Sequence, residues 1–200
     1  MKIAVVLILA GIGVLGRAEA DVDADSSTVR VCVQDGIGNP ILKLNWAKTI
    51  ASSMFARAGV RIVWQSSERD PRHTQPPIVL TLASNTPEKF PPNIYAYALV
   101  FEGVHIRIFV DHVIERAHHE TTLATFLLAH VMVHEIAHIL EGLNDHSPEG
   151  IMKATWTEAD IKGMTVKPLS FTPGDIRLIR AGLAVRNPAK TQSLAARGPR

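Results

Sequence analysis

A strongly apolar helical pattern over residues 121–141 constrains the fold more than any other part of the sequence. Its large apolar residues recur at helical spacing, and Gly142 ends the pattern. A helix that is apolar around most of its circumference is stable in water only inside a core. We therefore expect the rest of the chain to form layers that cover this helix. The apolar residues that define the pattern are Leu123, Phe126, Leu127, Val131, Ile136 and Leu140.

Polar residues interrupt this apolar helix near its end, in the order His134-Glu135-Ile136-Ala137-His138. Histidines four residues apart lie one turn above each other on a helix face, so both rings can bind one ion. Burying two histidines and a glutamate is costly unless something binds them. We therefore predict a metal site with one catalytic Zn²⁺, because zinc favours nitrogen ligands and leaves one position for water. Glu135 can reach that water as the general base.

The segment after the helix offers a third histidine ligand. Gly142 allows the helix to end and the chain to turn back, so that His146, eight residues after His138, can approach the metal. Met152 follows shortly after His146. For His130, one turn before His134, we expect a structural role in the core.

This arrangement of a zinc-binding helix, a glycine turn, a third histidine and a later methionine resembles the metzincin clan of zinc endopeptidases. Residues 142–147 look like the matrix-metalloproteinase version, and residues 134–156 are also similar to small exported bacterial proteins of peptidase type. The resemblance implies that Met152 packs beneath the metal without binding it. The turn between His138 and His146 is two residues longer than in metzincins, and Lys153 and Ala154 stand where some members have a tyrosine.

Glu158 is a rival third ligand. It lies twenty residues after His138, which is the spacing seen in thermolysin-like enzymes, and Asp160 could then orient a histidine. An acidic residue at this place is also typical of the first turn of a helix, where the helix dipole stabilises it. We favour His146 and keep Glu158 as the alternative.

The remaining patterns predict an α+β fold with a twisted mixed sheet of four or five strands. A backing helix and the zinc-binding helix cover the sheet, and a small irregular C-terminal lobe ends in a final helix. We expect one domain over residues 21–185, with an N-terminal lobe to about 142 and a C-terminal lobe over 143–185. Expected strands are 28–34, 60–65, 78–83, 94–101 and 105–110, and expected helices are 41–58, 121–141, 157–164 and 173–185.

The sequence predicts that the two ends of the chain lie outside the folded domain. Residues 1–20 have a basic start, a short apolar run and a small-residue ending, which predicts a signal peptide cleaved after Ala20. We therefore expect a secreted or periplasmic protein with no stable membrane anchor after cleavage. Residues 186–200 are predicted to be a flexible basic tail.

The charge balance and the cysteine content argue against several classes of function. With 21 basic and 19 acidic residues, the chain has no strong charge bias toward nucleic acid, so we expect no nucleic-acid partner. A single cysteine, Cys32, excludes an internal disulfide and a multi-cysteine zinc site. The export signal and the near-neutral charge also argue against a metal-dependent nuclease.

These observations together predict a zinc metallopeptidase that hydrolyses peptide bonds through a metal-activated water, with Glu135 as general base. A peptide or protein substrate would add as an antiparallel strand to an edge of the sheet, at residues 94–101 or 105–110. The alternatives are a zinc-binding module without catalytic activity and a peptidase that uses Glu158 as its third ligand.

Overall fold

The computed structural model describes residues 27–68 and 75–186, and it confirms the predicted α+β fold. The predicted signal peptide and most of the basic tail lie outside these residues. A five-stranded mixed sheet has the strand order β2-β1-β3-β5-β4. Strands β2, β1, β3 and β5 are parallel neighbours, whereas β4 runs antiparallel to β5 and forms one edge. The strands are β1 (Thr28–Asp35), β2 (Arg61–Gln65), β3 (Ile78–Ala83), β4 (Ala96–Ala98) and β5 (His105–Phe109).

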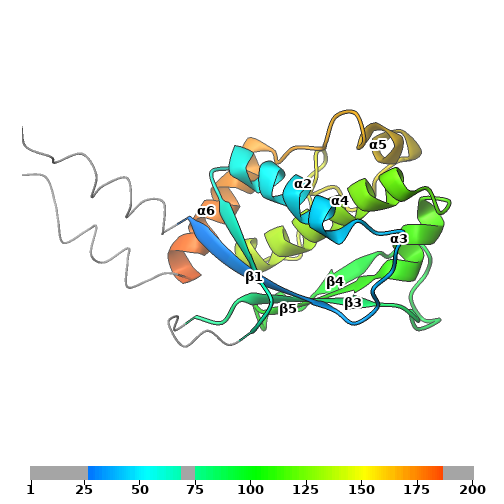
Figure 1. Ribbon diagram of the computed structural model, residues 1–200. Coiled ribbons are helices and arrows are strands. Elements are labelled where there is room, and N and C mark those ends of the chain that lie inside the picture. The colour runs from blue at the N-terminus through cyan, green and yellow to red at the C-terminus, as the bar shows by residue number, and fades with distance from the viewer. Residues whose placement is uncertain (1–26, 69–74, 187–200) are drawn as a thin grey trace, which may run out of the picture.

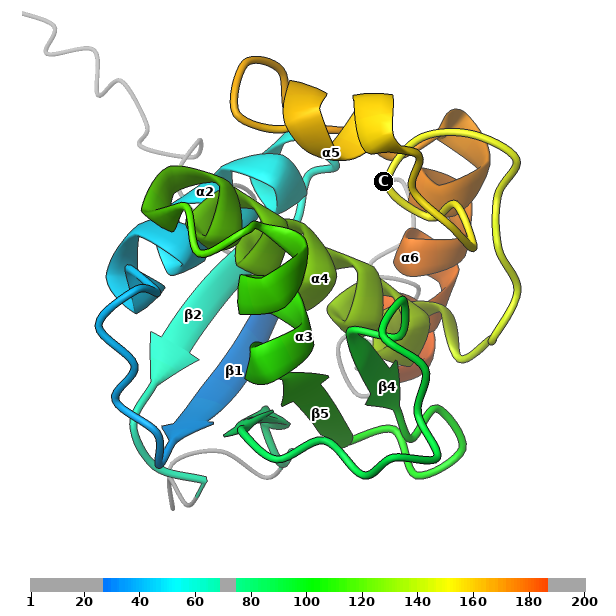
Figure 2. The same cartoon turned by 90° about the vertical axis from the view of Figure 1, so that its right-hand side faces the viewer.

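Helices α2 (Leu44–Arg57) and α4 (Thr121–Glu141) lie side by side over one face of this sheet (Figures 1 and 2). Residues on β5 show how the sheet presents an apolar face to them: Ile106 and Ile108 are buried, whereas His105 and Arg107 are exposed. This alternation is typical of a strand with one face on the core and one face in water.

Helix α4 is the centre of the core. Sixteen of its 21 residues are buried. The Glu120 side chain caps the start by accepting from the Thr122 and Leu123 N–H groups, and Gly142 ends the helix in the left-handed conformation, with φ of 68°. The helix is long and apolar enough to cross a membrane, but most of it is buried inside the fold. It is therefore explained as a core helix, as the sequence predicts.

Helix α3 (Val110–Arg116) follows β5 directly and is absent from the sequence-based expectation. Its buried residues, Val110, Val113 and Ile114, have the three-to-four spacing of a helix, but they follow a strand that is equally apolar. The expected strand over 94–101 is also shorter than predicted, since only Ala96–Ala98 pairs as β4. Both differences matter for the site, because α3 and β4 line the cleft described below.

The C-terminal part of the chain packs against α4 (Figure 2). It contains α5 (Glu158–Gly163) and α6 (Pro173–Arg186), close to the two helices predicted there. Helix α6 crosses α4 at Gly182, where a Cβ atom would lie 1.6 Å from the Leu140 carbonyl oxygen. Only glycine permits this approach of the two backbones, which fixes α6 against the C-terminal end of α4.

Candidate metal centre

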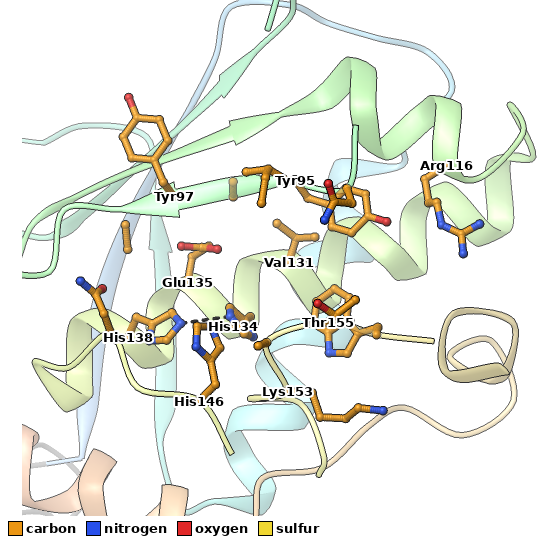
Figure 3. Close-up of a pocket in the computed structure, with 17 residues that line it drawn as sticks. Tyr95, Tyr97, Arg116, Val131, His134, Glu135, His138, His146, Lys153 and Thr155 are labelled. Carbon is orange, nitrogen blue, oxygen red and sulfur yellow. Dashed lines mark hydrogen bonds between the residues drawn. The ribbon is translucent and has the colours of Figure 1, made fainter. Parts of the chain in front are cut away.

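Three histidines from two segments meet at the C-terminal end of α4 (Figure 3). His134 and His138 lie one turn apart on α4, and His146 comes from the irregular segment that follows Gly142. One ring nitrogen from each lies within 4.8 Å of the others, so the group can hold a metal ion. The structure thus confirms that the three predicted histidines come together, while the identity of the metal stays a prediction.

Hydrogen bonds to backbone carbonyls fix the tautomers of the two helical histidines. His134 Nδ1 lies 2.9 Å from the Ile151 carbonyl oxygen, and His138 Nδ1 lies 2.9 Å from the Leu143 carbonyl oxygen. A carbonyl oxygen only accepts, so each Nδ1 carries the proton and donates it. In the neutral rings both Nε2 atoms are therefore unprotonated and present lone pairs.

Those two Nε2 atoms lie 3.0 Å apart. Two lone pairs at this distance repel each other unless a cation lies between or beside them. A proton is a poor candidate, because burial lowers the pKa of His134 to about 4 and also lowers that of His138. A metal ion satisfies both nitrogens without protonating either ring, so the donor set fits a metal that prefers imidazole.

The third histidine closes the group from the solvent side. His138 and His134 are only 5% and 8% exposed, whereas His146 is exposed. The ring centroid of His146 lies 5.3 Å from that of His134 and 4.9 Å from that of His138. Two of the three histidines thus lie on a buried helix, and the third lies on an exposed, irregular segment.

The segment that carries His146 is shaped by the residues that the resemblance singles out. The Gly142 N–H donates to the His138 carbonyl, and the left-handed backbone there turns the chain back toward α4. Met152 is 1% exposed, and its carbonyl accepts from the Ser147 N–H at 2.8 Å. This bond ties the stretch after His146 to the buried turn that contains Met152.

Glu135 lies in the same cleft as the three histidines (Figure 3). It is 8% exposed, and burial raises the pKa of its carboxyl to about 8. A cation held by the neighbouring histidines would favour the ionised form. A buried carboxylate beside a metal-binding group is the arrangement that a general base needs.

The structure does not bring Glu158 into the histidine group. Glu158 lies in the first turn of α5, more than half exposed, where it pairs with Arg116 and with Lys162. Asp160 is engaged in the capping box of α5 with Thr157 and pairs with Lys153. The helix-start interpretation therefore accounts for both acids, and neither belongs to the histidine group.

His130 has a different environment from the two histidines that follow it on α4. It is fully buried, its Nδ1 lies 2.7 Å from the Phe126 carbonyl, and its Nε2 accepts from the Leu169 N–H at 3.1 Å. Both nitrogens are satisfied by the protein, which agrees with the structural role expected for it. Burial lowers the pKa of His130 to about 4, so the ring is neutral.

A cleft of about 600 Å³ opens over His134, His138 and His146. Strand β4 forms one side and residues 153–156 form the other (Figure 3). The Tyr95 carbonyl and the Leu99 N–H bond to β5, so alternation along the strand directs the main-chain groups of Ala96 and Ala98 away from β5. The cleft therefore has an unpaired strand edge along one side.

Several residues of the cleft were not predicted from the sequence. Tyr95 and Arg116 line it far from the histidines in sequence, and the carbonyls of Leu143 and Ile151 orient the rings. Backbone carbonyls have no side-chain signature that sequence reasoning can detect. The Trp156 indole N–H also donates to the Ile151 carbonyl, at 3.2 Å, so this carbonyl contacts both Trp156 and His134.

The comparisons with known proteins do not assign this site to a family. No family model matches the chain, and a search of curated proteins gives no match. The interpretation of the site therefore rests on its residues and their arrangement.

Proposed function

We propose that this protein is a zinc-dependent endopeptidase of metzincin-like type, exported from the cell that makes it. The observation that carries the proposal is that His134, His138 and His146 form a group that can hold one metal ion, with the buried Glu135 in the same cleft. The all-nitrogen donor set supports zinc. Export rests on the pattern of residues 1–20, outside the described part of the chain.

Chemistry at this site divides between the metal and the protein. When bound, a zinc ion would supply Lewis-acid activation of a water molecule and of the scissile carbonyl. Glu135 takes a proton from the attacking water and passes it to the leaving amine. The Leu143 and Ile151 carbonyls keep the two helical rings in the tautomer that presents Nε2, as carbonyl partners of metal-binding histidines commonly do.

Strand β4 supports an extended peptide as the substrate. Its outward main-chain groups at Ala96 and Ala98 can pair with a peptide lying antiparallel to β4, and the small side chains leave room in the cleft. Of the two edges considered from the sequence, this geometry favours residues 94–101, since β5 is paired on both sides.

The test compares Glu135→Gln with a matched control on the same helix. Glu141→Gln is the same chemical change six residues further along, at a residue that does not line the cleft. With zinc supplied, Glu135→Gln should lower the rate of peptide cleavage by roughly 10²- to 10⁴-fold while zinc content stays unchanged. Glu141→Gln should cleave like the wild type.

Two results would contradict the proposal. Cleavage by Glu135→Gln at the wild-type rate would remove the proposed general base. A wild-type protein that binds zinc but cleaves none of a broad mixture of denatured proteins and peptides would favour the non-catalytic zinc-binding module.

A further inference from the structure

We propose that Asp175, in the first turn of α6, is a positioning residue that holds His146 in reach of the metal by binding the neighbouring Ser147. The inference rests on the proposed function for the metal ion that the three histidines would hold. It deepens that function, because it assigns the support of the third ligand to a second helix.

His146 depends on its own segment for support more than the other two histidines do. His134 and His138 lie on the buried helix α4, and each has an Nδ1 bond to a backbone carbonyl. In the described part of the chain, the His146 ring packs against those two rings but has no such bond (Figure 3). Its place is therefore set by the backbone on either side of it.

Ser147, the residue after His146, fixes that backbone with two hydrogen bonds. Its N–H donates to the Met152 carbonyl at 2.8 Å, and its hydroxyl donates to Oδ1 of Asp175. The first bond closes the turn over residues 147–152 and moves with that turn. The second bond holds the start of the turn against another helix, directly beside His146.

The Asp175 carboxylate has a separate task for each of its oxygens. Its Oδ2 accepts from the Thr172 N–H at 2.7 Å, and the Asp175 N–H donates to the Thr172 hydroxyl at 3.2 Å. This reciprocal pair is a capping box for the start of α6, and it uses only one carboxylate oxygen. The other oxygen, Oδ1, accepts from Ser147. Helix capping therefore does not account for the bond to Ser147.

Burial distinguishes Asp175 from an ordinary capping acid on a surface helix. Asp175 is 2% exposed, and Glu135 is the only other buried acid in the described residues. Burying a carboxylate is costly unless its oxygens accept hydrogen bonds, so Oδ1 needs a partner as much as Oδ2 does. Ser147 is that partner, and water competes little for a bond at this depth. The bond can therefore restrain an otherwise exposed segment.

The far end of the same turn has its own attachment. The Ile151 N–H donates to the Ser170 carbonyl at 2.9 Å, and the Ile151 carbonyl accepts from His134 Nδ1 at 2.9 Å. This end of the turn therefore supports His134, just as its start supports His146. Loss of the Asp175 bond should release the His146 end and leave the bond to His134 in place.

Titration with Co²⁺ tests the inference, because Co²⁺ binds the same kinds of ligand as zinc and absorbs visible light according to its coordination geometry. Ser147→Ala removes the hydroxyl, and Asp175→Asn leaves one acceptor oxygen for two donors. Each should weaken Co²⁺ binding by about 10-fold and shift the spectrum toward that of His146→Ala, the reference for a two-histidine site. Ser147→Thr keeps the hydroxyl and should restore the wild-type affinity and spectrum.

Two control variants separate positioning from other effects of these changes. Thr172→Ala removes the acceptor of the Asp175 N–H but leaves Oδ1 and Ser147 in place, so it should cost stability and keep the Co²⁺ affinity. Glu141→Gln removes an acid near Asp175 and should also bind Co²⁺ like the wild type. Thermal unfolding without metal checks that every variant is folded.

Wild-type Co²⁺ affinity and spectrum in either Ser147→Ala or Asp175→Asn would overturn the inference, as would an equal loss of affinity in Thr172→Ala. Cleavage plays no part in these measurements, so a protein that binds Co²⁺ and cleaves no peptide contradicts the proposed function alone. A wild-type protein that binds no Co²⁺ would contradict both.

Discussion

Two successive regions of helix α4 bury histidines in different ways. At His130, the protein supplies a partner for each ring nitrogen, an acceptor from Phe126 and a donor from Leu169. At His134 and His138, the protein supplies a partner only for Nδ1, and the two Nε2 atoms face each other at 3.0 Å. The first arrangement is complete without a ligand, whereas the second becomes favourable only when a cation is bound.

The difference shows how one apolar helix can carry both structural and metal-binding histidines. A buried polar ring is tolerated when its hydrogen bonds are satisfied, and it is costly when they are not. The same helix and nearly the same burial thus lead to opposite expectations for metal dependence. Each prediction below tests one side of this comparison.

The largest expected effect is stabilisation by zinc at the His134–His138 pair. At a free zinc concentration 1,000-fold above Kd, binding should raise the free energy of unfolding by about 4 kcal/mol. His138→Ala should abolish this gain, and His130→Gln should keep it, because Gln supplies one donor and one acceptor without a metal. Thermal unfolding with zinc and with a chelator measures both. Equal stabilisation by zinc in the two variants would contradict the distinction between His130 and the His134–His138 pair.

The contact between α6 and the C-terminal end of α4 gives the next effect. Gly182→Ala places a Cβ atom 1.6 Å from the Leu140 carbonyl oxygen, a backbone atom that cannot rotate away. We expect a loss of about 3 kcal/mol in the free energy of unfolding, because α6 must move off α4. Chemical denaturation measures it. Gly36→Ala, where a Cβ atom meets nothing within 4 Å, is the control and should cost far less.

The neutral state of His130 predicts a dependence on pH. Its pKa is lowered to about 4 in the folded protein, so the unfolded chain binds the proton first as pH falls below the ordinary value near 6.5. Stability from this group is therefore complete above pH 6.5 and is lost toward pH 4, by about 2 kcal/mol between pH 7 and pH 5. Denaturation of metal-free protein should show a steeper loss in the wild type than in His130→Gln. Equal slopes would mean that His130 is not held neutral.

The smallest effect concerns Glu141, at the end of the same helix. Burial and the nearby acids Asp175 and Asp145 raise the pKa of Glu141 to about 7, and its Oε1 atom is buried without a hydrogen-bond partner in the described residues. A carboxyl whose pKa is raised in the folded protein costs nothing below its ordinary pKa, and stability is lost as pH rises from that value through the folded one. Glu141→Gln should therefore stabilise the protein by about 1 kcal/mol at pH 8 and have less effect at pH 5. Denaturation at the two pH values measures this, and a destabilisation at pH 8 would show that the charge has a partner.

The sequence predicted those parts of the fold that depend on periodic apolar patterns. The bounds of α4 and β3 agree with the expectation, and Gly142 ends α4 as its position indicated. Helix α3 was missed because Val110, Val113 and Ile114 continue an apolar strand without a turn residue between them. Strand β4 is shorter than expected because the chain turns directly after it, where the Leu99 carbonyl accepts from the Glu102 and Gly103 N–H groups.

For the site, the spacing of His134 and His138 was sufficient to predict that their rings lie together, because both residues are on one helix. Placing His146 depended on the path of an irregular segment, and the sequence left Glu158 open as its rival. Glu158 pairs with Arg116, which is far from it in sequence, and with Lys162 on the surface of α5. Such contacts follow from the assembled fold, so no local pattern reveals them.

The most direct test of the account is the zinc content per chain of the purified protein and three variants, His146→Ala, Glu158→Ala and His130→Gln. The account predicts about one zinc in the wild type, Glu158→Ala and His130→Gln, with loss or strong weakening only in His146→Ala. Zinc retained by His146→Ala and lost from Glu158→Ala would contradict the three-histidine site. A wild type that binds no metal even when zinc is supplied would contradict the account as a whole.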